Sequence, residues 1–197
     1  MPQYFISRTR KNEIKDIVLD ILQKSGTTAL PIDLGKIVKH FGIRCIGADK
    51  ITTRNSAQAA VEDGYILQSG TGYVIVYNPS HIRGRIRFTI ACQLAHIFLG
   101  HLASGVSDRT TDIEAAYFAD ELLMPLSVLD SLGCRSAERI AQQCDVSLTA
   151  AKIRLKDFAR RDKYRKFNGE TEYDLQFMRQ FLFPPKAEKN QIKDMPK

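Results

Sequence analysis

The sequence predicts an α+β fold in which helices precede and follow a short run of strands. Apolar residues recur at helical spacing near the N-terminus and again through the second half of the chain. Between these parts, residues 43–77 include short segments rich in β-branched and aromatic residues. The 197 residues are 44% hydrophobic, which is enough to build a core. No apolar run reaches the length of about 18 residues that a membrane span needs, so we expect a soluble protein with no membrane partner.

Two helices are predicted ahead of the strands. The first spans residues 11–24 and ends at Ser25-Gly26. Its apolar stripe consists of Ile14, Ile17, Val18, Ile21 and Leu22. The second follows Asp33 and ends at Gly42, and its apolar stripe again has helical spacing. We expect both helices to be scaffold.

Three strands are predicted next, over residues 43–46, 59–68 and 73–77. The last two are separated by Ser-Gly-Thr-Gly at residues 69–72. Glycines at such a break favour a tight turn, so these two strands should form a hairpin.

A buried helix, predicted over residues 85–100, carries side chains that could bind a metal ion or take part in catalysis. Cys92 and His96 stand four residues apart on it, so both side chains leave the same face. A second helix, over residues 112–124, is expected to begin at the cap Asp112 and brings Glu114 toward the first. Thiolate, imidazole and carboxylate are all zinc ligands, so Glu114 could complete a site.

The five residues from Cys92 to His96 differ from the zinc-hydrolase motif H-E-x-x-H. In that motif both histidines bind metal and the glutamate takes a proton from the metal-bound water. Here the first ligand is Cys92 and the base position holds Gln93, whose amide cannot accept a proton.

The run R-x-R-F-T-I-A-x-x-L-A-H-x-x-L-G-H, followed by E-A-A-Y-F-A-x-E-L-L-M-P, resembles the ImmA/IrrE family of bacterial and phage metallopeptidase-like regulators. The likeness covers roughly Asp16 to Phe158. It implies a zincin-like fold, with metal ligands at Cys92, His96 and Glu114 and a general base at Gln93. It also implies a partner, typically a repressor-type transcription factor in a phage, mobile-element or stress-response circuit.

Three arrangements of this site stay open. In the first, zinc binds Cys92, His96 and Glu114 and hydrolysis survives, although two anionic ligands and the missing base both oppose it; Glu121, on the same helix, could replace the base. In the second, zinc binds the same residues as a structural metal ion, and no peptide is hydrolysed. In the third there is no metal, and Cys92 and His96 are core residues.

We therefore expect a catalytically degenerate pseudo-peptidase that regulates by binding a repressor-type transcription factor. One alternative is an active zinc endopeptidase with a Cys-His-Glu site that cleaves a repressor. The other is a regulator that binds DNA directly.

A zincin arrangement also predicts where a partner peptide binds. The last strand then runs beside the metal helix, and its exposed edge can accept an extended peptide by strand addition. The residues expected at this edge are Tyr73, Val74, Ile75, Val76, Tyr77 and Asn78.

The domain boundaries predicted from these patterns are 1–130 for the zincin domain, 131–183 for a helical segment and 184–197 for a disordered tail. Within the helical segment, residues 137–155 resemble a helix-turn-helix, with Asp145 in the turn and Ser147 capping the second helix. The usual turn glycine is missing.

The net charge of +7 is concentrated in this segment. Eight cations lie within fifteen residues, namely Lys152, Arg154, Lys156, Arg160, Arg161, Lys163, Arg165 and Lys166. They form either a solvated helix face or a surface that attracts phosphates. If DNA binds, we expect Lys152, Arg154, Arg160 and Arg161 to contact it.

The cysteines and the N-terminus predict a cytoplasmic protein. Cys45, Cys92, Cys134 and Cys144 form no C-x-x-C pair, which argues against a zinc ribbon or a disulfide framework. The first residues contain no apolar stretch followed by a cleavage site, so secretion is not indicated.

Overall fold

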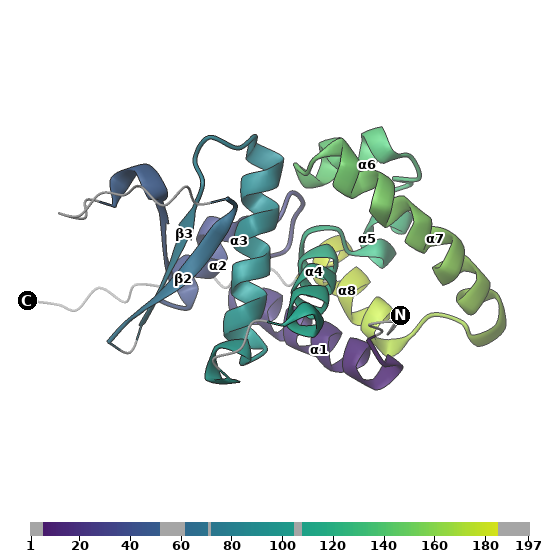
Figure 1. The fold of residues 1–197 in the computed structure, drawn as a ribbon. Coiled ribbons are helices and arrows are strands. Elements are labelled where there is room, and N and C mark those ends of the chain that lie inside the picture. The colour runs from purple at the N-terminus through teal and green to yellow at the C-terminus, as the bar shows by residue number, and fades with distance from the viewer. Residues whose placement is uncertain (1–5, 52–61, 71, 105–107, 185–197) are drawn as a thin grey trace, which may run out of the picture.

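The computed structural model describes residues 6–51, 62–70, 72–104 and 108–184. A three-stranded mixed sheet lies at one end of the molecule, and helices pack on it and on one another (Figure 1). This arrangement confirms the predicted α+β class. Residues 185–197 of the tail expected over 184–197, and the predicted strand residues 59–61, fall outside the described residues.

The helices follow the periodicity of the sequence. In chain order they are α1 (Arg8–Lys24), α2 (Leu34–His40), α3 (Arg83–Phe98), α4 (Arg109–Leu123), α5 (Leu126–Ser131), α6 (Ala137–Cys144), α7 (Leu148–Asn168) and α8 (Glu172–Leu182), with short 3-10 turns η1 (Ala48–Lys50) and η2 (His101–Ser104). Three helices begin with a capping side chain that accepts a hydrogen bond from a backbone N–H group of the first turn. These caps are Ser7 for α1, Asp33 for α2 and Ser147 for α7. The cap of α4 is Asp108, which forms a capping box with Thr111, so the prediction of Asp112 as the cap was wrong.

The sheet has the strand order β1 (Arg44–Gly47), β3 (Gly72–Tyr77), β2 (Gly64–Ser69). β1 pairs parallel to β3, with Arg44 opposite Val74. β2 pairs antiparallel to β3, with Ser69 opposite Gly72, which confirms the hairpin. β3 is thus the middle strand, and Val74, Ile75 and Val76 are all buried. The prediction that residues 73–78 form an exposed edge was therefore wrong, because both edges of β3 are already paired.

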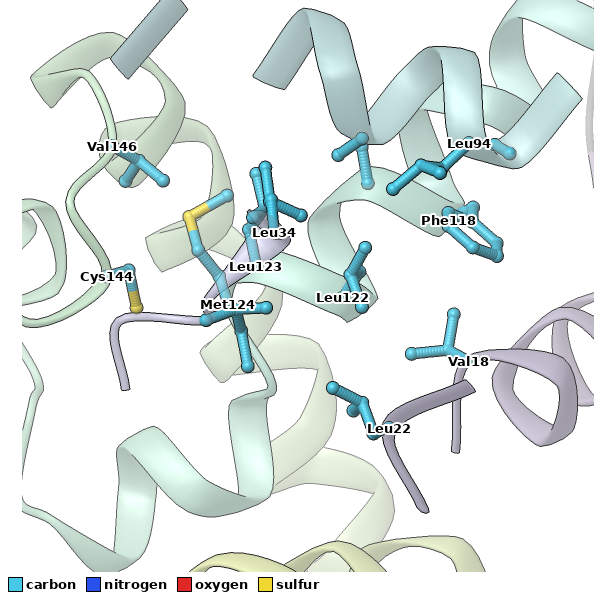
Figure 2. Packing of buried hydrophobic residues seen from close by; sticks show 14 of the residues in the cluster. Val18, Leu22, Leu34, Leu94, Phe118, Leu122, Leu123, Met124, Cys144 and Val146 are labelled. Carbon is cyan, nitrogen blue, oxygen red and sulfur yellow. The ribbon is translucent and has the colours of Figure 1, made fainter. Parts of the chain in front are cut away.

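The core lies where α3 passes between the sheet and α4 (Figure 1). Figure 2 shows apolar side chains gathering there from α1, α2, α3, α4 and the turn between α6 and α7. Val18 and Leu22 come from α1, and Leu94 comes from α3. The same cluster includes Phe158 of α7 and Phe177 of α8, so the C-terminal helices share the core of the sheet and α4. The predicted boundary at residue 130 stays a prediction.

The turn between α6 and α7 is docked against the start of α3. Asp145 adopts the left-handed conformation, with φ 53°, that glycine usually provides at this point of a helix-turn-helix. Its carboxylate accepts a hydrogen bond from Arg83 Nε at 2.6 Å. A Cβ at Gly84 would lie 2.6 Å from the backbone nitrogen of Ser147. α3 and this turn can therefore meet only because residue 84 has no side chain.

None of the helices in the described ranges is both long enough and apolar enough to cross a membrane.

Candidate functional site

Cys92, Gln93 and His96 of α3 line one cavity of about 270 Å³. Asp112 and Ala115 of α4 close its other side. The remaining lining residues are Asp63, Arg85, Phe88 and Thr89. The helical spacing in the sequence thus places the three α3 residues together.

Gln93 fastens α3 to the sheet. Its amide nitrogen donates a hydrogen bond to the carbonyl oxygen of Gly64, at the start of β2, over 3.4 Å. Gly64 permits this close approach, because a Cβ there would meet Thr89 Cγ2 at 2.8 Å. A glutamate carboxylate at position 93 would have no proton to donate to this carbonyl at neutral pH. The residue in the base position therefore acts as a hydrogen-bond donor.

Cys92 lies in surroundings that favour the neutral thiol. Burial raises the pKa of Cys92 to about 12, and the carboxylates of Asp120 and Asp112 add to the effect. Burial also lowers the pKa of His96, with a further contribution from His101. The thiolate is the form of cysteine that binds metal, so metal binding here would have to displace the proton of a buried thiol.

Glu114 does not line this cavity and is bound by other groups. Arg10 of α1 donates from Nε to Glu114 Oε1 at 2.9 Å and from Nη2 to Oε2 at 2.7 Å. His101 Nε2 lies 3.1 Å from the same Oε2 atom, and His101 Nδ1 lies 3.1 Å from His96 Nδ1. The hydrogen bond from Arg10 is the main cause of the lowered pKa of Glu114.

This geometry does not fit the predicted zinc ligand set. Ala115 and Ala119 of α4 are buried, and Ala115 faces α3 across the cavity. Glu114 is turned by about 100° from Ala115 around the helix axis, toward α1. Among the described residues, no group of three or more His, Cys, Asp or Glu side chains is arranged to hold a metal ion. Glu114 is therefore not placed to share an ion with Cys92 and His96.

Sequence reasoning missed two carboxylates at the cavity and the arginine behind it. Asp112 lies one helical turn before Ala115, so the apolar stripe of α4 could have placed it opposite α3. Asp63 precedes β2 and accepts a hydrogen bond from Arg85 Nε at 2.7 Å. Arg10 is 104 positions from Glu114, and no local pattern could have linked the two.

Glu121 does not approach the cavity and cannot replace the missing base. It is buried, and its Oε1 atom lies 3.0 Å from Arg154 Nη2. Arg154 is itself only 1% exposed, and its Nε donates to the carbonyl oxygen of Met124 at 2.8 Å. The prediction that Arg154 faces DNA was therefore wrong, because its guanidinium holds α4 and α7 together.

The other three residues proposed for DNA contact divide between the surface and the interior. Lys152 is exposed, and the side chain of Arg160 is 76% exposed. The side chain of Arg161 is 9% exposed and pairs with Asp130 at 2.8 Å and with Glu170 at 2.5 Å. Arg161 is thus a structural residue as well.

A second cavity, of about 580 Å³, lies between α1, α4, α7 and the start of α8. Arg154 and Glu121 line it, and Lys15 stacks over Tyr173 at its wall, 4.9 Å from the ring centre. Of the residues predicted for catalysis or metal binding, Glu121 alone lines it, and this carboxylate pairs with Arg154. We therefore keep the smaller cavity beside α3 as the candidate functional site, although the second cavity has the larger volume.

Comparison with known protein families supports the resemblance seen in the sequence. The family model described as IrrE N-terminal-like domain matches residues 40–156, which is more than half of the chain. The model represents a peptidase family, Peptidase_M78, that is typically zinc-dependent. A search of curated proteins found no match.

Proposed function

This chain belongs to the IrrE N-terminal-like domain family. We propose that it serves as a regulatory binding protein and does not hydrolyse peptide bonds. Its partner would be a repressor-type transcription factor, the class that the family resemblance implies. The zincin-like fold then provides the binding surface, and the degenerate motif on α3 contributes to packing.

The observation that supports this proposal most directly is that the general-base position holds Gln93, whose amide is bound to the sheet. General base catalysis needs a group that accepts a proton from water, and it typically contributes about a hundred- to ten-thousand-fold in rate. The Gln93 amide cannot do this, and it is already engaged with Gly64 of β2. Arg10 binds Glu114, so this carboxylate is not available as the third metal ligand that hydrolysis would need.

The open edge of β2 supports strand addition as the binding mode. Among the described strands β2 pairs only with β3, so beyond Gly64, whose carbonyl accepts from Gln93, its other edge could accept an extended segment of the partner. Tyr65 and Leu67 are large apolar side chains on this strand and are 38% and 43% exposed. They would supply side-chain contacts, while the backbone of β2 would supply the hydrogen bonds.

Binding to a repressor-type transcription factor encoded near the gene tests this proposal. We expect the purified protein to bind the immobilised repressor in biolayer interferometry, with an affinity that a metal chelator leaves unchanged. Leu67→Asp should weaken binding at least about tenfold, because a charge would have to be buried against the partner strand.

Leu132→Asp is the matched control, because Leu132 is 41% exposed at the end of α5, outside the sheet. Hydrogen exchange gives an independent readout: bound repressor should slow exchange of the β2 amides in the wild-type protein. Equal loss of binding in both variants, or no protection of β2, would argue against strand addition. No binding at all would contradict the proposed function.

A further inference from the structure

The outward side of α7 carries a straight row of cations. Lys152, Lys156, Arg160, Lys163 and Lys166 are all exposed. Their spacing of three or four residues keeps them on one side of the helix. At about 1.5 Å per residue the row is about 21 Å long. We call these five residues the α7 cationic row.

The helix separates its paired cations from these exposed ones. Arg154, Arg161 and Arg165 turn inward or along the flank, where each has carboxylate partners. In the part of the chain that the structure describes, none of the four lysines of the α7 cationic row forms an ion pair. Arg160 contacts Asp157 at 3.3 Å but keeps 76% of its side chain exposed. The described residues therefore leave most of the charge of the row without a counter-charge.

The acids of α7 do not interrupt the row. Asp157 contacts Arg154 and Arg160, each at 3.3 Å. Asp162 contacts Arg135 at 2.6 Å and Arg165 at 3.3 Å, on the flank of the helix. A polyanion that lay along the row would thus meet five cations and no unpaired carboxylate of α7.

We propose that the α7 cationic row binds the phosphate backbone of duplex DNA without reading its sequence. A rigid straight row of charges is complementary to a rigid polyanion, and duplex DNA has a persistence length of about 150 base pairs. Lysine suits this role because its ammonium group contacts phosphate as a point charge. The inference does not depend on the proposed repressor partner.

This mode of contact differs from that of a helix-turn-helix that reads the major groove. Such a motif reads bases with the N-terminal residues of its second helix. Here the start of that helix lies against α3, where Ser147 N approaches Gly84 and Asp145 pairs with Arg83. Arg154, which would reach the bases, is buried. The surface left for DNA is the side of α7.

Fluorescence anisotropy with a labelled duplex of about 20 base pairs tests the proposal, over about 50 to 200 mM salt. Five phosphate contacts predict that the logarithm of the affinity falls with the logarithm of salt with a slope of about −4.5. The triple variant Lys152→Gln, Lys156→Gln, Lys163→Gln leaves two contacts and should reduce the slope to about −1.8. At about 100 mM salt its affinity should fall more than about a hundredfold.

The matched control replaces Lys39, Arg44 and Lys50 with glutamine. These residues are exposed on α2, β1 and η1, and their loss lowers the net charge by the same three units. The control should bind like the wild type, and two duplexes of unrelated sequence should bind equally well. No binding at low salt, equal loss in both triple variants, or a strong sequence preference would overturn the proposal.

Discussion

Arg154 is a charged side chain in a position that otherwise belongs to the core. Burial opposes its charge, but the carboxylates of Glu121, Asp120 and Asp157 outweigh burial and raise its pKa. The guanidinium also reaches the backbone of Met124, where α4 ends. Removal of a single partner from such a buried pair leaves an uncompensated charge in the interior.

Replacing Arg154 with alanine should therefore destabilise the protein strongly. We expect the free energy of unfolding, measured by urea denaturation with circular dichroism, to fall by about 3–5 kcal/mol. Arg160→Ala is the control, because an exposed pair with Asp157 contributes at most about 1 kcal/mol. A loss in Arg154→Ala no larger than in the control would show that the buried contacts contribute little.

Asp120 should give the protein a characteristic dependence on pH. Burial raises the pKa of Asp120 to about 6, from 3.8, with Arg154 acting in the opposite direction. Between these two values the folded state keeps a proton that the unfolded state has released. The free energy of unfolding should therefore fall as pH rises through this window, by about 3 kcal/mol from this group.

Asp120→Asn isolates this contribution from that of the other acids. The asparagine variant lacks the titrating group, so its stability relative to the wild type should increase from about pH 4 to pH 6 and then stay level. Urea denaturation of both proteins across this range measures the difference. A difference that does not change with pH would show that Asp120 ionises normally in the folded state.

At the scale of elements, α3 is positioned by two close backbone contacts. Gly64 lets β2 approach α3, and Gly84 lets the α6–α7 turn approach its N-terminal end. At Gly84 the nearest atoms are the backbone of Val146 and Ser147, which cannot rotate away as a side chain can. α3 is thus fixed both to the sheet and to the C-terminal helices.

Gly84→Ala should destabilise the protein even though alanine favours helix formation. A glycine-to-alanine change inside an unobstructed helix gains up to about 1 kcal/mol. Here the new Cβ would lie 2.6 Å from Ser147 N, so the turn must shift, and we expect a net loss of about 1–3 kcal/mol in urea denaturation. Gly35→Ala in α2, whose Cβ would meet only a side-chain oxygen, should change stability by less. A stabilised Gly84→Ala protein would contradict this packing.

Much of the element pattern was predictable because it depends on local sequence. Helical spacing identified α1, α3 and α4, and the glycines at 70 and 72 indicated the hairpin. The residues of β3 were predicted correctly, but its place in the sheet was not, although its run Val74-Ile75-Val76 is typical of a strand covered on both faces. α7 continues to Asn168, and paired arginines along its flank hold its last turns, which no local pattern predicts.

At the scale of the whole molecule, the packing of α1 on α4 decides the chemistry of the site. The sequence correctly places Cys92, Gln93 and His96 at one cavity, because their spacing is local. It could not predict the orientation of Glu114, since that depends on which helix supplies its partner. The fold brings Arg10 to Glu114 and Arg154 to Glu121, so each carboxylate is paired with an arginine.

The central claim is that this member of the IrrE N-terminal-like domain family binds its partner without cutting it. Intact-mass spectrometry of the repressor after prolonged incubation with the purified protein and added zinc tests it most directly. We predict that the complex forms and that the mass of the repressor stays unchanged. Repressor fragments that accumulate with time and disappear when a chelator is added would contradict it.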